Sequence, residues 1–110
     1  MKTIFVLEDD NTARSVMKRY LNVRKFDVFS FENPVEALRF LKSNPKTKVD
    51  CFVTDNDMPQ MTGTEFIPIA RKKFPNANII MVSGTNQENC QADKFMPKPV
   101  NLRELETLLT

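Results

Sequence analysis

Histidine is absent from this chain of 110 residues, and cysteine occurs only twice. The missing histidine removes the commonest general base and the commonest ligand of transition metals. Cys51 lies in an apolar run and Cys90 in a polar one, so the two match neither a disulfide framework nor a zinc motif. Any chemistry must therefore come from carboxylates, hydroxyls and lysine.

Long apolar runs and nucleotide-binding loops are absent as well. No apolar run approaches the roughly 20 residues of a membrane-spanning helix, and the first residues lack the apolar stretch and cleavage site of a signal peptide. We expect a cytoplasmic protein without membrane contact. Neither GxxxxGK(S/T) nor GxGxxG occurs to cradle a nucleotide, so a phosphoryl donor would arrive on another molecule.

Neither sign of charge is in large excess, since sixteen Lys and Arg face fourteen Asp and Glu. The net charge of +2 argues neither for nor against nucleic acid, because a binding surface depends on how charges cluster. Basic residues are spread along the chain, so no basic patch is evident and no direct contact with nucleic acid is expected. The length and the apolar fraction of 41% suit one compact domain over residues 1–110.

Short apolar runs alternate with segments of helical period, a pattern typical of a parallel sheet covered by helices on both faces. The predicted strands are 4–7, 27–31, 49–54, 78–82 and 94–96. Three capping pairs predict helix starts: Asn33 with Glu36, Thr62 with Glu65, and Asn101 with Glu104. Pro68 is expected to kink or delay the third helix, because it lacks a backbone donor. The prediction is an α/β, doubly wound, five-stranded parallel sheet.

The connection between the fourth and fifth strands is short. Ten residues, 84–93, are available for a crossover that normally takes about a dozen or more and usually contains a helix. Only Cys90 and Ala92 are apolar in it, which leaves no stripe to bury. We therefore expect at most one helical turn there, so that the fourth helix is short or missing.

Polar residues gather where four of the predicted strands end. The carboxyl ends of parallel strands are where such sheets bind ligands. Five acids, two hydroxyls and one lysine fall there: Glu8, Asp9, Asp10, Asp55, Asp57, Ser83, Thr85 and Lys98. Singly, these residues fit helix caps, turns or a surface lysine. Together, five acids repel one another unless a cation lies among them, which favours a metal site.

Oxygen donors without histidine or thiolate suit Mg²⁺ or Mn²⁺. An aspartate can accept a phosphoryl group, a metal offsets charge on the transferring oxygens, and serine or lysine can bind the remaining ones. The gathered residues therefore indicate phosphoryl chemistry.

Four motifs, in order, resemble those of the receiver domain of two-component response regulators. They are Val-Leu-Glu-Asp-Asp followed by Arg14, Thr-Asp-Asn-Asp-Met-Pro-Gln-Met-Thr-Gly, Met-Val-Ser-Gly-Thr and Met-Pro-Lys-Pro-Val. The resemblance covers nearly the whole chain and implies a flavodoxin-like strand order 2-1-3-4-5. It implies a signalling switch of a phosphorelay, which takes a phosphoryl group from a histidine kinase or a histidine phosphotransfer protein. Such a domain is no enzyme beyond transfer to its own aspartate and loss from it.

The resemblance also implies how the metal and the acceptor are arranged. Asp55 would be the phospho-acceptor. Asp9 and Asp55 would bind Mg²⁺ directly, Glu8 would bind it through water, and Asp57 would contribute its backbone carbonyl.

Three further residues take roles by the same resemblance. Ser83 would bind a phosphoryl oxygen and reorient on phosphorylation, and Phe95 matches the aromatic switch position. Lys98 would pair with the phosphate or with Asp55, next to a cis Lys98–Pro99 bond. In the family the fourth helix, fifth strand and fifth helix form a common surface for partners. With a short fourth helix, we expect a remodelled surface around Phe95 for an output partner or a dimer.

Three other functions share part of this pattern. Asp55 and Asp57 after a strand resemble the haloacid-dehalogenase phosphatases, but those enzymes carry further metal-binding acids downstream, and here the second cluster lies upstream. Glu8 with Asp-x-Asp also resembles Toprim domains of nucleic-acid enzymes, which leaves Ser83 and Lys98 unexplained. A degenerate receiver that acts only as an interaction module usually lacks an acid or the lysine, and neither is lost here.

Overall fold

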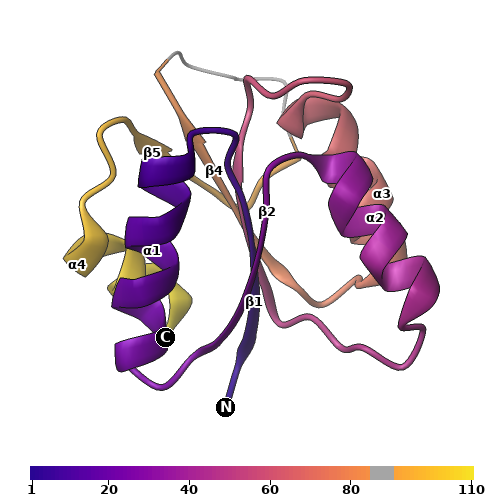
Figure 1. The fold of residues 1–110 in the computed structure, drawn as a ribbon, viewed down its shortest axis with the longest axis horizontal. Helices are drawn as coiled ribbons and strands as arrows, with labels where there is room; N and C mark the ends of the chain where they lie inside the picture. Colours follow the sequence, from indigo (N-terminus) through magenta and orange to yellow (C-terminus); the bar gives the residue numbers. More distant parts are fainter. Residues whose placement is uncertain (85–90) are drawn as a thin grey trace.

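Residues 1–84 and 91–110 are described by the computed structural model, and within them five parallel strands form one sheet (Figure 1). The strands are β1 (Thr3–Leu7), β2 (Asp27–Phe31), β3 (Cys51–Asp55), β4 (Asn78–Ser83) and β5 (Lys94–Pro97). Their order is β2-β1-β3-β4-β5, which confirms the predicted flavodoxin-like fold. Each strand begins and ends within two residues of its predicted bounds.

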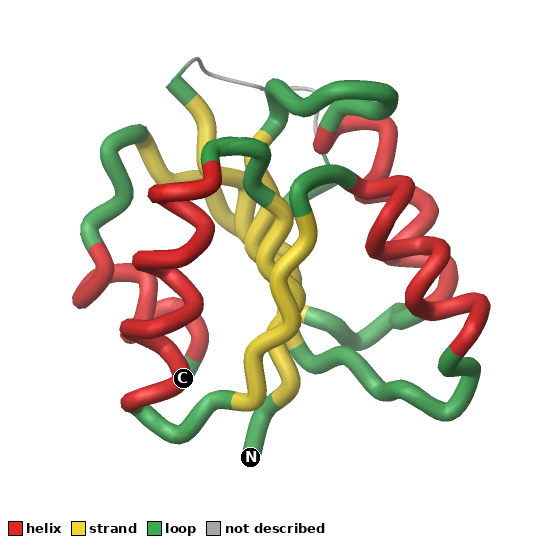
Figure 2. The backbone as a smooth tube through the Cα atoms, viewed as in Figure 1, coloured by secondary structure: helices red, strands yellow, loops and turns green. Residues whose placement is uncertain are grey.

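Helices cover both faces of the sheet, as the alternating pattern predicts. They are α1 (Asn11–Val23), α2 (Pro34–Ser43), α3 (Gly63–Lys73) and α4 (Leu102–Leu109). The helix labelled α4 follows β5, so it is the last helix that the sequence predicts and not the short or missing one between β4 and β5. Figure 1 and Figure 2 show α1 and α4 on one face and α2 and α3 on the other. No helix among the described residues is long and apolar enough to cross a membrane.

The two faces of the sheet build separate apolar cores. Along β1, Ile4 and Val6 join the cluster under α1 and α4, whereas Phe5 and Leu7 join the cluster under α2 and α3. This alternation follows from the pleat of a strand, and burial on both sides explains why the strands are apolar throughout. The layer under α2 and α3 is rich in aromatic side chains, with ring centroids 5.0–5.9 Å apart.

The helices begin at the capping residues that the sequence predicts. The side chains of Asn33, Thr62 and Asn101 each accept the backbone N–H three residues later, and Thr62 forms a complete capping box with Glu65. Pro68 lies inside α3, which still runs from Gly63 to Lys73. The expected delay of this helix is therefore wrong, because the capping box starts α3 before the proline is reached.

The prediction of at most one helical turn in 84–93 falls mainly on residues 85–90, which lie outside the described residues. Asp93, the residue directly before β5, is hydrogen-bonded to Ile79 of β4. Its Oδ2 accepts the Ile79 N–H at 2.7 Å and an Arg71 N–H at 2.8 Å, while its own N–H donates to the Ile79 carbonyl at 2.8 Å. Arg71 also donates to the Ala77 carbonyl at 2.7 Å. Asp93 thus joins α3, β4 and the start of β5.

The charged form of Asp93 is favoured by these partners. Burial opposes it, but the Arg71 guanidinium and the Ile79 amide outweigh burial and lower the pKa of the Asp93 carboxyl. A lowered pKa stabilises the fold above the ordinary pKa of aspartate, and this stability is lost as the pH falls through the folded-state pKa.

Asp93→Asn should destabilise the protein at pH 7 by about 1 kcal/mol, a modest amount because the carboxylate is 42% exposed. Urea unfolding measures this difference. It should shrink below roughly pH 4, where the aspartate of the unfolded chain takes up its proton. Asp27→Asn, an exposed aspartate at a strand start, is the control and should change little. An equal deficit for Asp93→Asn at both pH values would contradict the argument.

Gly63→Ala should cost about 2 kcal/mol, because a Cβ at Gly63 would overlap the carbonyl oxygen of Asp55 and lie 3.1 Å from the Asn56 Cα. Neither backbone atom can move without shifting the end of β3. Gly84→Ala is the matched control, since a Cβ there meets nothing within 4 Å. Equal unfolding free energies for the two variants would show that the close approach at Gly63 carries no cost.

Candidate functional site

Strand order brings the predicted site residues together at the carboxyl edge of the sheet. β1 and β3 are neighbours with Leu7 opposite Thr54, so Glu8 and Asp55, the next residues, end adjacent strands. Val82 lies opposite Asp55, which places Ser83 at the end of the next strand. Lys98 follows β5 directly. Four strands therefore supply the site, as the sequence predicts.

Lys98 joins the two buried acids. Its Nζ lies 2.7 Å from Oδ2 of Asp55 and 3.5 Å from Oε1 of Glu8. Both acidic side chains are 3% exposed, whereas the lysine side chain is 36% exposed. The ammonium thus reaches in from the solvent side and provides the positive charge that two buried carboxylates need.

A metal ion would find three carboxylates within reach. Glu8, Asp9 and Asp55 each offer an oxygen, and these oxygens lie within 4.8 Å of one another. Glu8 and Asp55 are buried, and Asp9 is exposed. The donor set contains only oxygen, which fits a hard cation such as Mg²⁺ or Mn²⁺. Asp57 is exposed, and its N–H donates to Oδ1 of Asp55 at 3.3 Å.

Crowding of the acids raises the proton affinity of Glu8. Burial, the hydrogen bond with Asp55 and the charge of Asp55 together raise the pKa of the Glu8 carboxyl to about 7, although Lys98 acts against them. For Lys98, burial disfavours the ammonium, but the hydrogen bond and charge of Asp55, with Glu8, outweigh it and raise the pKa. The lysine therefore stays charged beside Asp55.

Backbone contacts hold Glu8 at the start of α1. Arg14 donates to the Glu8 carbonyl at 2.8 Å, and the Asp10 N–H points to Oε2 of Glu8 at 3.4 Å. Asp10 also caps α1 by accepting the Thr12 N–H at 3.0 Å. The capping role that the sequence allowed for Asp10 is thus the one found, and Asp10 is not among the three clustered acids.

Asn56 holds the loop after β3 and is a residue that the sequence did not single out. It is buried, and its Oδ1 accepts the N–H of Thr64 at 3.0 Å and the hydroxyl of Thr64 at 2.7 Å. Its carbonyl accepts the Gly63 N–H at 3.0 Å. These bonds join the residue after Asp55 to the first turn of α3. Only the position of Asn56 between two acids could have drawn attention to it.

The remaining predicted residues lie at or near the same edge. Ser83 is buried at the end of β4. Phe95 lies in β5 opposite Met81 and is 44% exposed. The Lys98–Pro99 bond is cis, as the resemblance implies. Thr85 lies outside the described residues. The structure brings Ser83 and Lys98 to the same edge and places Phe95 within β5, and the roles of these residues stay predictions.

A groove of about 500 Å³ borders the acids between α1 and the connection to α4. It is lined by the polar residues Glu8 and Lys98 and by apolar residues that include Val16 and Leu102. The site is therefore bordered by an open groove on the α1 side, which Glu8 and Lys98 help to line.

Comparison with known proteins identifies a related family. The family model described as the response regulator receiver domain matches residues 4–110. The response regulator receiver protein CpdR of Brucella abortus is 30% identical over 112 residues, which cover 96% of this chain and 91% of CpdR. The sensor kinase CckA of Brucella abortus is 33% identical over 112 residues, which cover 96% of this chain but 12% of CckA. Against several such longer relatives, the chain spans less than a third of their length.

Solved structures of response regulators have a similar fold. The response regulator TrrA of Thermotoga maritima, in complex with Mg²⁺ and BeF, superposes with a TM-score of 0.82 at 28% identity. The match covers 97% of this chain and 95% of that one. The similarity thus extends over both molecules.

Proposed function

Because the chain belongs to the receiver domain family of response regulators, a family of signalling domains in two-component systems, we propose that Asp55 accepts a phosphoryl group with the help of Mg²⁺. The donor would be a phosphohistidine of a histidine kinase or a histidine phosphotransfer protein. One observation carries the proposal: the Asp55 carboxylate is buried, lies among acids that suit a metal, and contacts a lysine at 2.7 Å.

Each group has a defined part in the proposed transfer. A carboxylate oxygen of Asp55 attacks phosphorus, the bond from phosphorus to the donor nitrogen breaks, and an acyl phosphate forms. When bound, Mg²⁺ or Mn²⁺ offsets the charge on the transferring oxygens. Glu8, Asp9 and the Asp57 carbonyl would hold the ion with Asp55.

Lys98 and Ser83 would bind oxygens of the phosphoryl group once Asp55 has accepted it. The Lys98 ammonium already lies at Oδ2 of Asp55, from which it can pair with a phosphoryl oxygen. Ser83, buried at the neighbouring strand end, would bind another oxygen and reorient. Phe95, in β5 and three residues before Lys98, would change its position when Ser83 reorients. Phosphorylation would thereby change the surface around β5.

The alternatives explain less of the arrangement. A phosphatase of the haloacid-dehalogenase type would carry further metal-binding acids downstream of Asp55, whereas here the second acidic cluster, Glu8 and Asp9, lies upstream. A Toprim enzyme gives no role to Lys98, whose ammonium lies 2.7 Å from Oδ2 of Asp55. A module that is never phosphorylated gives no reason for two carboxylates to be buried together beside a lysine.

Asp55→Asn should abolish incorporation of phosphate from a small phosphoramidate donor in the presence of Mg²⁺, because the amide is no nucleophile. Intact mass spectrometry measures the added phosphoryl group. Asp27→Asn makes the same chemical change at an exposed position on the other end of the sheet and should label like the wild type. Labelling of Asp55→Asn at the wild-type rate would refute the assignment of the acceptor.

Lys98→Ala should keep Mg²⁺ binding, because an ammonium repels the cation and is no ligand. The affinity, from titration calorimetry, is expected to stay the same or to become tighter. The phosphorylated variant should lose the structural response, seen as smaller amide shift changes around β5 in NMR spectra than in the wild type. A loss of Mg²⁺ affinity in Lys98→Ala would contradict this role.

A further inference from the structure

Charged residues that are spread along the sequence are sorted by the fold to opposite ends of the sheet. The connections at the amino ends of β1, β2, β3 and β4, with the last turns of the helices that lead into them, carry nine Lys and Arg and two Asp. These segments are 1–3, 20–27, 40–51 and 70–78. The sequence alone showed no basic patch, and the fold corrects this reading.

The opposite edge, which holds the acceptor, has the reverse balance. Its connections and first helical turns carry nine Asp and Glu against three Lys and Arg. These segments are 7–14, 31–37, 55–66 and 97–105. The domain is thus strongly polarised along its strands although its net charge is only +2.

Segments 1–3, 20–27, 40–51 and 70–78 form what we term the basic end, and six lysines lie in the last three of them. They are all exposed: Lys25, Lys42, Lys46, Lys48, Lys72 and Lys73. None of them has an ion-pair partner in the described part of the chain. By contrast, Arg24 pairs with Glu106 and Arg71 with Asp93, so these two cations are already engaged.

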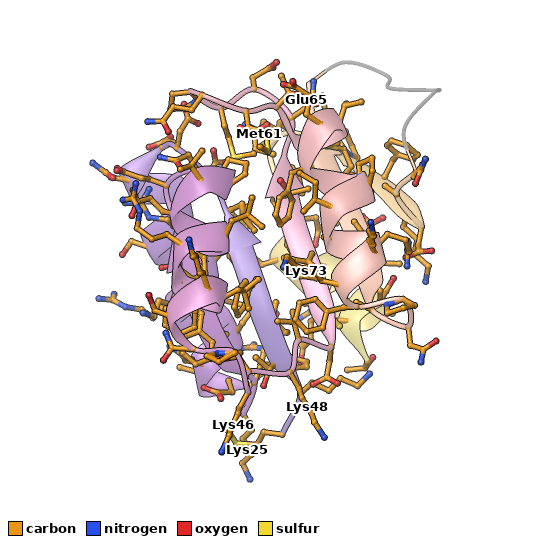
Figure 3. The ribbon with its side chains drawn as sticks, turned by 90° about the vertical axis from the view of Figure 1, so that its right-hand side faces the viewer. Lys25, Lys46, Lys48, Met61, Glu65 and Lys73 are labelled. Atoms are coloured by element: carbon orange, nitrogen blue, oxygen red, sulfur yellow. The ribbon has the colours of Figure 1, made fainter. Side chains whose placement is uncertain are left out.

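Backbone contacts place the lysine-bearing loops next to one another. The Asp27 N–H, two residues after Lys25, donates to the carbonyl of Lys2 at 2.9 Å. The adjacent Thr3 N–H donates to the Asp50 carboxylate, two residues after Lys48, at 2.8 Å. Both loops therefore flank the start of β1. Figure 3 shows Lys25, Lys46 and Lys48 together at this end, with their side chains directed away from the sheet, and Lys73 higher on α3.

We propose that the basic end docks onto the surface of a lipid bilayer that carries anionic headgroups. Lysine ammonium groups are compact, mobile and strongly hydrated, which suits diffuse attraction to a charged surface better than geometric recognition of one ligand. Val23, 71% exposed at the end of α1, can enter the headgroup layer beside Lys25.

Nucleic acid fits this end less well. Within the described residues, the basic end presents neither an arginine free of an ion pair nor an exposed aromatic side chain on which a base could stack. Its lysines come from loops and helix ends, so no helix is offered along its length to a groove. A flat anionic surface requires neither an unpaired arginine, nor a stacking aromatic ring, nor a helix that fits a groove.

The acidic edge gives the docked molecule one orientation. An anionic surface attracts the basic end and repels the edge with Glu8, Asp9 and Asp55, so the polarised molecule binds with that edge facing the solution. The acidic edge, and not the basic end, then faces other molecules in solution. Docking is independent of the proposed phosphoryl transfer, since no residue of the basic end lies in that site.

The test is co-sedimentation of the whole chain with vesicles of phosphatidylcholine that contain phosphatidylglycerol. We expect binding that weakens as salt is raised, and no binding to vesicles of phosphatidylcholine alone. Lys46→Glu/Lys48→Glu should lower the affinity by about tenfold or more, because each lysine near an anionic surface contributes to binding. The same variant should still incorporate phosphate at Asp55, which separates this proposal from the previous one.

The control variant is Lys18→Glu/Arg19→Glu, which makes the same change of net charge on the exposed side of α1. It should keep most of the binding, and circular dichroism should show both variants folded. Equal losses in the two variants would overturn the proposal, because net charge alone would then act. Absence of binding to anionic vesicles would also overturn it, as would tighter binding to a short DNA duplex than to vesicles at equal phosphate concentration.

Discussion

The burial of two carboxylates at adjacent strand ends is the constraint on which the rest of this structure depends. Glu8 and Asp55 are both almost inaccessible, and neighbouring carboxylates in such a place repel each other. The Lys98 ammonium at 2.7 Å from Asp55 compensates, and burial with the Asp55 charge still raises the pKa of Glu8 to about 7. This arrangement requires β1, β3 and β5 in one parallel sheet, because each of the three groups follows or ends a different strand.

The same constraint shapes the backbone around the site. The carbonyl of Asp55 lies so close to the start of α3 that only glycine fits at position 63. Asn56 then joins the loop to Thr64 through its side chain, and Arg14 holds the Glu8 carbonyl from α1. The site and the helix starts are therefore built from shared atoms, and a change in one is transmitted to the other.

A parallel sheet has a further consequence for charge. Every connection from a strand to a helix lies at one edge, and every connection from a helix to a strand lies at the other. Here the first kind is acidic and the second kind basic, so the two ends can meet different partners. The phosphoryl donor of the proposed reaction would approach the acidic edge, and the proposed anionic surface would meet the basic end.

The sequence by itself determined what depends on local order. Apolar periodicity marked all five strands, and the capping residues Asn33, Thr62 and Asn101 marked helix starts, because both signals act over a few residues. The motifs likewise predicted a site at Glu8, Asp9, Asp55 and Lys98, side chains that the fold brings together. Only the tertiary structure decided that Asn56 is a buried support, that Pro68 does not delay α3, and that the pKa of Glu8 is raised. It also decided that Lys25, Lys46 and Lys48 lie together at one end. Each of these depends on which segments the sheet and loops bring together in space, and no local pattern in the chain records those distances.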